Sequence, residues 1–400
     1  MSPLYNRGAH SYSCISKDKE DGNIGKYYRY FVVFTLSILV VVLVILSIYY
    51  GGNARSITLE DTTDFILYET KVILNSVYSK ITGEDLFHIP PLSEEKKFKY
   101  ILLREVRLPP ILGAIIVGIT LSGCGLMLQT LFRNILASPY TTGISSGVLF
   151  AVTLVIFIES VAQLFSIFPI DEKIVAGWCG GILSLIILLI IALRVKEING
   201  VLIVALLFSY LFTGISSYLV ANGEELSIVE YYMFMIGNLT RVNIHNLLPL
   251  TLITLIFVTG SIFLIKPLNA LLFGESYARS FGLDVKKIRV LILLLTSFVV
   301  GAIVPYLGLM AFVGIAAPYM ARVVIKTSDH RWLLPTTMLL GIILMLVAHL
   351  ISLKYWVPIH YLYGINRPAQ VLPVGSILQI IGGLLVIYLV YKGEKSIRIQ

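Results

Sequence analysis

Charged residues are scarce in this sequence, and their scarcity limits the class to which the protein can belong. Asp, Glu, Lys and Arg make up 14% of its 400 residues, whereas 57% are hydrophobic, and the mean hydropathy is +0.87. A water-soluble domain of this composition would expose far too much apolar surface to water. The composition therefore excludes that class and indicates a polytopic membrane protein.

The residue patterns of catalytic and metal sites are also missing. The three cysteines, Cys14, Cys124 and Cys179, lie far apart and match no metal or redox spacing. No phosphate loop of the form G-x-x-x-x-G-K-S/T occurs, and no nucleophile–base pair or cluster of His, Asp and Glu has useful spacing. These absences argue against a membrane-embedded enzyme. We expect no catalytic residue, no metal site and no cofactor bound by this chain.

We interpret ten apolar runs as membrane-spanning helices, since about 20 apolar residues suffice to cross a bilayer. The first run is too long for a signal peptide and lacks a small-residue cleavage site, so we expect it to remain uncleaved. The boundary between the seventh and eighth runs is the least defined, because Gly301, Pro305 and Gly308 could break one long helix. The predicted fold class is an all-α polytopic membrane protein with about ten transmembrane helices. The runs comprise residues 30–50, 111–132, 144–168, 174–193, 201–220, 247–265, 290–309, 310–325, 333–352 and 372–391.

The distribution of Lys and Arg predicts the orientation of these spans. With the N-terminus inside, most basic residues fall on the inner side, and the outer ones gather in one long loop, residues 51–109. Both ends are then cytoplasmic: the tail 1–28 and the tail 394–400 flank a transmembrane domain at 29–393 of a multi-pass cell-membrane protein. The net charge of +8 is explained by this topology and does not indicate nucleic acid.

A segment between spans six and seven, residues 267–289, is too polar to lie in lipid and too apolar for an idle loop. Pro267 suits the first turn of a short helix, and Gly274 offers its end. A second short helix over residues 275–281 can be closed by Gly282, after which Asp284 could cap the next span. The pattern predicts two amphipathic helices at the cytoplasmic surface. The alternative is a re-entrant loop resting on lipid headgroups.

Small residues dominate one face of the second span. Ala114, Gly118, Ser122, Gly125 and Gln129 recur at helical spacing. Small side chains let helix backbones approach closely, which is how helices associate in lipid. Gln129 on the same face needs a hydrogen-bonding partner. In the preceding outer loop we expect either a short helix folded over the outer mouth or a plain solvated connector.

The fifth span carries hydroxyl groups on a polar stripe that includes Ser209, Thr213 and Ser216. Such hydroxyls either line a pathway or bond back to carbonyl groups of their own helix. The sequence leaves both alternatives open.

Several short motifs in order carry a family resemblance that extends from about residue 57 to the end of the chain. They are Arg107–Leu108–Pro109, Ser122–Gly123, Arg133–Asn134, Leu136–Ala137, Leu272–Phe273–Gly274–Glu275, Phe281–Gly282, Phe312–Val313–Gly314, Asp329–His330–Arg331, Leu334–Pro335 and Leu372–Pro373–Val374–Gly375. Together they resemble the permeases of FecCD-type ABC importers for iron chelates and cobalamin. Departures occur at Pro110, Tyr319, His349 and Val371, where the family usually has Arg, His, Asp and Glu.

The resemblance implies a dimer with a second copy or a paralogue, enclosing a central pathway. It also implies two cytoplasmic ATP-binding subunits that hold ATP and Mg²⁺, and an outer solute-binding protein. The substrate would be an iron chelate (siderophore or haem) or a cobalamin-like compound, moved by ATP-driven alternating access. Siderophores, haem, cobalamin and oxyanions all fit the sequence.

The same resemblance implies roles for particular residues. Docking of the binding protein would use Arg107, with Arg104 one turn earlier and Arg367 in the last outer loop. The inner gate would lie at Ile198, Asn199 and Gly200, next to the stripe Ser209, Thr213 and Ser216. The residues implied in ATPase coupling are Leu268, Leu271, Leu272, Gly274, Glu275, Ala278, Arg279, Phe281 and Gly282.

The main rival interpretation is an ion-coupled secondary transporter of a small solute. Such a protein needs ionisable groups inside the membrane as coupling sites. The ten runs contain almost none, His349 being among the few.

Overall fold

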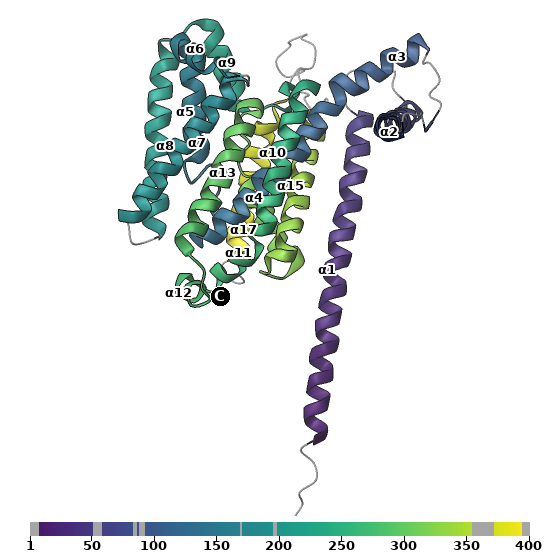
Figure 1. Cartoon of the computed structure of the whole chain (residues 1–400), viewed down its shortest axis with the longest axis vertical. Coiled ribbons are helices and arrows are strands. Elements are labelled where there is room, and N and C mark those ends of the chain that lie inside the picture. Colours follow the sequence, from purple (N-terminus) through teal and green to yellow (C-terminus); the bar gives the residue numbers. More distant parts are fainter. Residues whose placement is uncertain are drawn as a thin grey trace, which may run out of the picture.

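The computed structural model describes residues 8–50, 58–82, 86–87, 93–168, 170–194, 198–353 and 372–393, and no strand occurs in these ranges. The helices form a bundle with α1 along one side, where it packs against α15 (Figure 1). Their bounds are α1 Gly8–Tyr50, α2 Leu59–Thr82, α3 Glu94–Ile101, η1 Leu102–Arg107, α4 Leu108–Phe132, α5 Ile144–Phe157, α6 Glu159–Phe165, α7 Glu172–Arg194, α8 Ile198–Ala221, α9 Glu225–Ile236, η2 Leu239–Arg241, α10 Ile244–Phe263, α11 Ile265–Leu272, α12 Glu275–Ser280, α13 Val285–Leu307, α14 Val313–Ile325, α15 His330–Leu353 and α17 Val374–Gly393.

The predicted all-α polytopic fold is confirmed. In the described ranges, seven helices are long and apolar enough to cross a membrane, and the bent pair α5–α6 would make an eighth. The apolar helices α14 and α17 are shorter than these. All ten predicted runs therefore correspond to a helix or to a bent helix pair.

The prediction of one continuous helix over residues 144–168 is wrong. The chain turns by 109° between α5 and α6, and Ile158 has extended backbone angles at the break. The residues of α6 include Glu159 and Gln163, whose side chains hydrogen-bond to each other in an exposed position. These polar groups favour water over lipid, which accounts for the turn.

The second half of the predicted outer loop 51–109 is helical, because α3, η1 and α4 form one helical stretch, Glu94–Phe132. Its middle part, η1, is a π-helix, and the amide of Leu108 bonds to the carbonyl of Leu103. Pro109 and Pro110 follow directly. Since proline lacks an N–H group, the α-helical bonding pattern cannot pass through this point unchanged, and the widened turn accommodates it.

Helix α4 lies at the centre of the bundle and contacts α15, α14, α10 and α13. Its small-residue face makes the close contacts that the sequence predicts. A Cβ atom on Gly118 would lie 2.5 Å from the Cα of Ile342, and one on Gly125 would lie 1.9 Å from the carbonyl oxygen of Gly314. The backbones of α4, α14 and α15 therefore touch directly, without side chains between them.

The predicted partner of Gln129 is found on α14. Its Oε1 accepts a hydrogen bond of 2.7 Å from Arg322 Nη1, and its Nε2 donates one of 3.4 Å to the carbonyl of Gly314. Both polar ends of the amide are thus satisfied where the two helices meet.

We predict that Gly118→Val destabilises the fold by roughly 1–3 kcal/mol or more, since the added methyl groups meet backbone that cannot move aside. The melting temperature of the purified protein in detergent should fall by several degrees. Gly214→Ala in α8 is the matched control, because a Cβ there meets nothing within 4 Å. Equal melting temperatures for the two variants would contradict the role of the α4–α15 contact.

Candidate functional site

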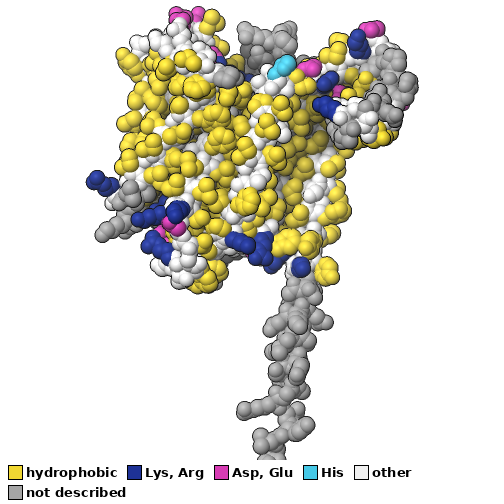
Figure 2. Space-filling view, in the orientation of Figure 1, with side chains coloured by type: hydrophobic (Ala, Val, Ile, Leu, Met, Phe, Trp, Pro, Cys, Tyr) yellow, Lys and Arg dark blue, Asp and Glu magenta, His cyan; other side chains and the backbone are white. Residues whose placement is uncertain are grey.

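The short helices α11 and α12 lie at one end of the bundle (Figure 1). Lys and Arg side chains gather around this end, and acidic side chains are found at the opposite end (Figure 2). We call these the basic end and the acidic end. The orientation predicted from the sequence makes the basic end the cytoplasmic one.

The predicted helix pair is confirmed, with one change at its start. Helix α11 begins at Ile265, two residues before Pro267, and ends at Leu272. Gly274 and Gly282 have φ angles of 113° and 79°, which suit glycine and turn the chain at either end of α12. Asp284 Oδ1 accepts the amide of Lys287 at 3.2 Å and caps α13 as predicted. This hydrogen bond is the main reason that the pKa of Asp284 lies below its usual value.

The buried side of the helix pair fixes it to the bundle. Leu268 and Ala278 are fully buried and Leu271 is 5% exposed, while Leu272 is half-buried. Three of the apolar residues predicted to couple to a partner therefore contact the rest of this chain instead. Any coupling surface must be formed by their outward-facing neighbours.

One polar contact fixes the end of α11. Arg133 Nη2 donates to the carbonyl of Leu271 at 3.2 Å and to that of Leu272 at 3.4 Å. Arg133 itself ends α4 in the left-handed conformation, with φ 47°. Carbonyl groups at a helix C-terminus lack partners within the helix, so this guanidinium satisfies them. The φ angle of 113° restricts position 274 to glycine, and a Cβ there would also lie 2.9 Å from the same Nη2.

A second polar contact runs from the middle of α11 to α4. Asn269 Nδ2 donates to Asp329 Oδ1 at 2.6 Å, and Asn269 Oδ1 accepts the amide of His330 at 2.8 Å. The ring of His330 connects Asn269 on α11 to Thr130 on α4. Its Nδ1 is 2.7 Å from Asn269 Oδ1, and its Nε2 is 2.9 Å from Thr130 Oγ1 on α4. We call this chain of contacts, from Asn269 through His330 to Thr130, the Asn269 bridge.

Asp329 stays ionised in this setting. Burial acts to raise the pKa of its carboxyl, but the hydrogen bonds from the Arg331 amide and the Asn269 side chain, together with the charges of Arg331 and His330, lower it below its usual value. The carboxylate thus remains an acceptor for Asn269.

The outward face of the pair carries three aromatic rings in a row, each tilted against the next. Phe273, Tyr277 and Phe281 are 70%, 46% and 66% exposed. Their ring centroids are 5.1 Å apart for the first two and 4.7 Å apart for the last two. Glu275 beside them pairs with Arg289 and, at 3.4 Å, with Arg279. An exposed apolar cluster with a charged rim is typical of a protein-binding surface.

Sequence reasoning included Phe281 in the site but missed Phe273 and Tyr277. It also missed the anchoring residues Asn269 and Arg133. The signal for the aromatic cluster was present, because residues 273, 277 and 281 recur at intervals of four. The anchors carry no comparable local signal, since their partners lie far away in the sequence.

The two predicted docking arginines that the structure describes differ in exposure: Arg107 is buried and Arg104 is exposed. Arg107 is only 4% exposed, and its Nη1 donates to the carbonyls of Ile48 at 2.7 Å and Tyr49 at 3.1 Å. The expectation that Arg107 faces a partner is therefore wrong for this conformation, because its guanidinium binds the end of α1. Arg104 has a side chain that is 54% exposed, at 3.8 Å from Glu69. Arg367 lies outside the described residues.

The predicted inner gate is the first turn of α8 rather than a separate tight turn, because the helix begins at Ile198. Gly200 is half-buried there, and the side chains of Ile198 and Asn199 lie outside the described part. The helix of the apolar run 201–220 therefore starts three residues earlier than the run itself and includes residues 198–200.

The hydroxyl groups of α8 bond to their own helix. Ser209 Oγ donates to the carbonyl of Ala205 at 3.1 Å, and Thr213 Oγ1 donates to that of Ser209 at 2.8 Å. They do not share one environment: Ser216 is buried, Ser209 is half-buried and Thr213 is exposed. The hydrogen bonds of Ser209 and Thr213 thus follow the second of the two sequence alternatives. Of Ser209, Thr213 and Ser216, only Thr213 is exposed.

Known proteins resemble this chain over most of its length. The model of the FecCD transport family matches residues 39–392. A protein of Methanocaldococcus jannaschii named as an ABC transporter permease is 57% identical over 88% of this chain and 94% of its own. The hemin transport system permease protein HmuU of Yersinia pestis is 27% identical over 73% of this chain and 84% of its own.

A solved structure agrees with the fold. It is described as an inward-facing conformation of a metal-chelate type ABC transporter, covers 90% of this chain and 99% of its own, and has a TM-score of 0.68 at 23% identity. The arrangement of helices is therefore that of an ABC permease. The chain belongs to the FecCD transport family, the transmembrane permease components of ABC importers.

Proposed function

We propose that this chain is the permease subunit of a binding-protein-dependent ABC importer for a metal chelate. The substrate class is an iron chelate, either a siderophore or haem, or a cobalamin-like compound. The observation that carries the proposal is the exposed aromatic cluster on a helix pair that two polar contacts fix to α4. The relatives named above support the substrate class, since one of them is named for hemin transport.

The proposed assembly follows from the surfaces that the single chain leaves uncovered. The basic end faces the cytoplasm, where two ATP-binding subunits with ATP and Mg²⁺ dock on the aromatic cluster. The acidic end faces a solute-binding protein. A second permease copy or a paralogue completes the pathway against α8, whose Leu207 and Leu211 are 57% and 52% exposed. Both termini are then cytoplasmic.

The proposed mechanism is alternating access. Closure of the ATP-binding subunits on ATP displaces α11 and α12, and the Arg133 contact and the Asn269 bridge pass that displacement to α4. Because α4 touches α14 and α15 backbone to backbone, these helices move as one body rather than yielding locally. The gates open and close as a result.

The rival, an ion-coupled secondary transporter, has less support. Such a protein needs carboxylates or other ionisable groups within its spans. Helices α4, α10, α13 and α15 contain no Asp or Glu. Nothing in these helices provides the acidic coupling site that this mechanism requires.

We predict that Phe281→Asp strongly weakens docking of the ATP-binding subunit. Loss of an aromatic hot-spot contact typically costs about 2 kcal/mol or more, which corresponds to roughly a 30-fold loss of affinity or more. Co-purification of the ATP-binding subunit and ATP-driven uptake in proteoliposomes are the measurements. Ser276→Ala, exposed on the same helix, is the matched control. Docking that survives in Phe281→Asp would place the ATP-binding subunit elsewhere.

A companion variant, Asn269→Ala, tests transmission separately from docking. It removes the Asn269 bridge but leaves the aromatic cluster in place. The ATP-binding subunit should still co-purify and hydrolyse ATP, while uptake per ATP hydrolysed falls. If uptake and hydrolysis fall in proportion, the bridge has no separate role in coupling.

We predict that Arg104→Glu slows capture of the loaded binding protein and flattens the salt dependence of its association rate. Exposed rim charges act mainly on association, and salt screens them. Stopped-flow binding at two ionic strengths measures this. Lys97→Glu, also exposed on the preceding turns, controls for net charge. An unchanged rate for Arg104→Glu alone would remove this residue from the docking surface.

We predict that Thr213 borders the pathway in the assembled transporter. In a background without Cys14, Cys124 and Cys179, Thr213→Cys should react with a water-soluble maleimide, and trapping of ATP should change the rate. Ser216→Cys is the matched control, since Ser216 is 1% exposed and should stay protected. Protection of both cysteines in every state would place this face of α8 in lipid.

A further inference from the structure

Helix α2 lies beside the bundle rather than within it. It contacts α1 and α3, and Figure 1 shows it end-on next to the end of α1 while α1 runs along the long axis of the picture. The axis of α2 therefore crosses that of α1. A helix in this position lies across the direction of the spans, outside the area that the bundle covers.

The depth of α2 relative to the membrane can be inferred from the end of α1, which lies next to it. The exposed apolar surface of α1 includes Val41 and Ile45, at 57% and 40% exposure, and extends to Tyr50 at 43%. The rings of Tyr49 and Tyr50 pack edge to face with centroids 4.8 Å apart. Tyrosine is enriched where a span leaves the hydrocarbon core and enters the headgroup layer. Since α2 begins shortly after Tyr50, it lies at the level of that layer.

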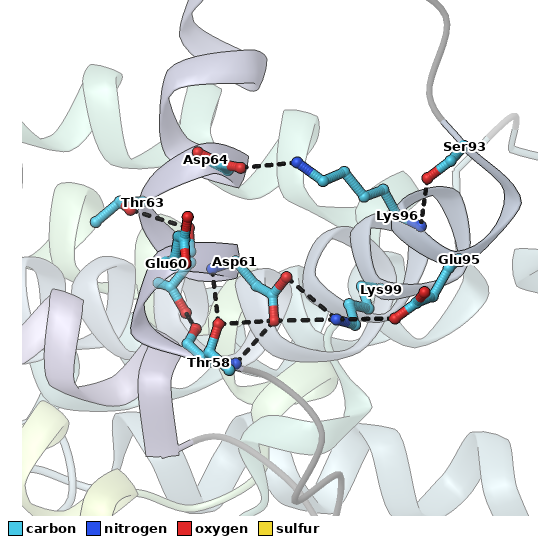
Figure 3. A network of polar contacts seen from close by, with 10 residues as sticks. Thr58, Glu60, Asp61, Thr63, Asp64, Ser93, Glu95, Lys96 and Lys99 are labelled. Carbon is cyan, nitrogen blue, oxygen red and sulfur yellow. Dashed lines mark hydrogen bonds and ion pairs between the residues drawn. The ribbon is translucent and has the colours of Figure 1, made fainter.

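One face of α2 is occupied by α3. Lys96 Nζ pairs with Asp64 at 3.0 Å, and Lys99 Nζ pairs with Asp61 at 3.2 Å (Figure 3). The same two helices also meet through the buried ring of Phe65, which packs against Tyr100 with centroids 5.5 Å apart. These contacts fix the rotation of α2 about its own axis.

A different face of α2 is apolar and uncovered. Leu67, Leu74 and Tyr78 are 60%, 45% and 37% exposed, and their spacing of seven and four places them on one stripe of the helix. Exposed Lys71 lies on the same stripe. Asn75 extends the surface, because its side chain exchanges hydrogen bonds of 2.6 and 2.7 Å with the backbone of Phe87, itself 37% exposed.

We propose that this stripe is a lipid contact: α2 lies in the headgroup layer at the acidic end of the protein, with Leu67, Leu74 and Tyr78 in the outer acyl boundary. Lys71 reaches lipid phosphates from the same face. The bilayer is the occupant that the geometry favours, because α2 stands outside the bundle at interfacial level, where lipid is the adjacent surface. An amphipathic helix with leucine and tyrosine on one face and charged side chains elsewhere has the pattern of interfacial helices.

The test measures the depth of nitroxide labels in the full-length protein after removal of its native cysteines. Labels are attached at Leu74→Cys and, as matched control, at Ser76→Cys, which is exposed two residues away on the opposite side of α2. In nanodiscs of phosphatidylcholine and phosphatidylglycerol, the label at position 74 should be accessible to oxygen and protected from a water-soluble nickel chelate. The label at position 76 should show the reverse.

Equal access of the nickel chelate to both positions in nanodiscs would overturn the proposal. Protection of position 74 from both oxygen and the nickel chelate would also overturn it, because a covering protein surface, such as a second copy of the chain, excludes both reagents, whereas lipid admits oxygen. Protection that arises only after addition of a binding protein would assign the stripe to that partner instead. None of these outcomes depends on whether α11 and α12 couple to an ATP-binding subunit.

Discussion

The Asn269 bridge is the contact on which the geometry of the basic end depends. Leu268 and Leu271 hold α11 against the bundle by burial, but apolar contacts are non-directional and would allow the helix to slide or rotate. The hydrogen bonds of the bridge are directional and fix the position and rotation of α11. Asn269 binds both Asp329 and His330, and His330 in turn reaches Thr130. A polar group with low exposure is costly when it lacks a partner, so any displacement of α11 relative to α4 must break several hydrogen bonds together. The bridge therefore gives α11 one register against the helix that it is proposed to move.

That register is useful only because α4 is rigid against its neighbours. In lipid, burial of apolar side chains between helices gains little, and close van der Waals contact takes its place. Gly118 against Ile342 and Gly125 against Gly314 bring three helices to backbone contact. The Gln129–Arg322 hydrogen bond then fixes their relative translation. A force applied at α11 acts on this unit as a whole, which is the condition that a coupling helix requires.

Much of this organisation could be predicted from the sequence because it rests on local signals. Apolar runs located the spans, two glycines and Asp284 located the α11–α12 pair, and a four-residue rhythm of small side chains located the packed face of α4. The features that the sequence did not predict depend on distant partners. Arg107 was expected at the surface, yet it binds carbonyls of α1 from nearly sixty residues earlier. Asn269 has no signal of its own, since its role comes from residues 329 and 330. The bend at Ile158 follows from which side chains meet lipid, which a linear pattern does not state.

The π-helix η1 is a point at which the helical stretch can bend, so that α3 and α4 need not move together. It lies between α3, which is ion-paired to α2, and α4, which carries Thr130 and Arg133 at its far end. A π-turn widens the helix and weakens its hydrogen-bond ladder, so bending is easier there than in the α-helical parts on either side. Arg107 at the end of η1 holds α4 to α1 directly. Movement of α4 can therefore be absorbed at η1 without tilting α3. In the proposed mechanism, an α2–α3 unit held in the headgroup layer would stay in place while the core of the bundle changes conformation, so that one continuous stretch, Glu94–Phe132, would contain both a fixed and a moving part.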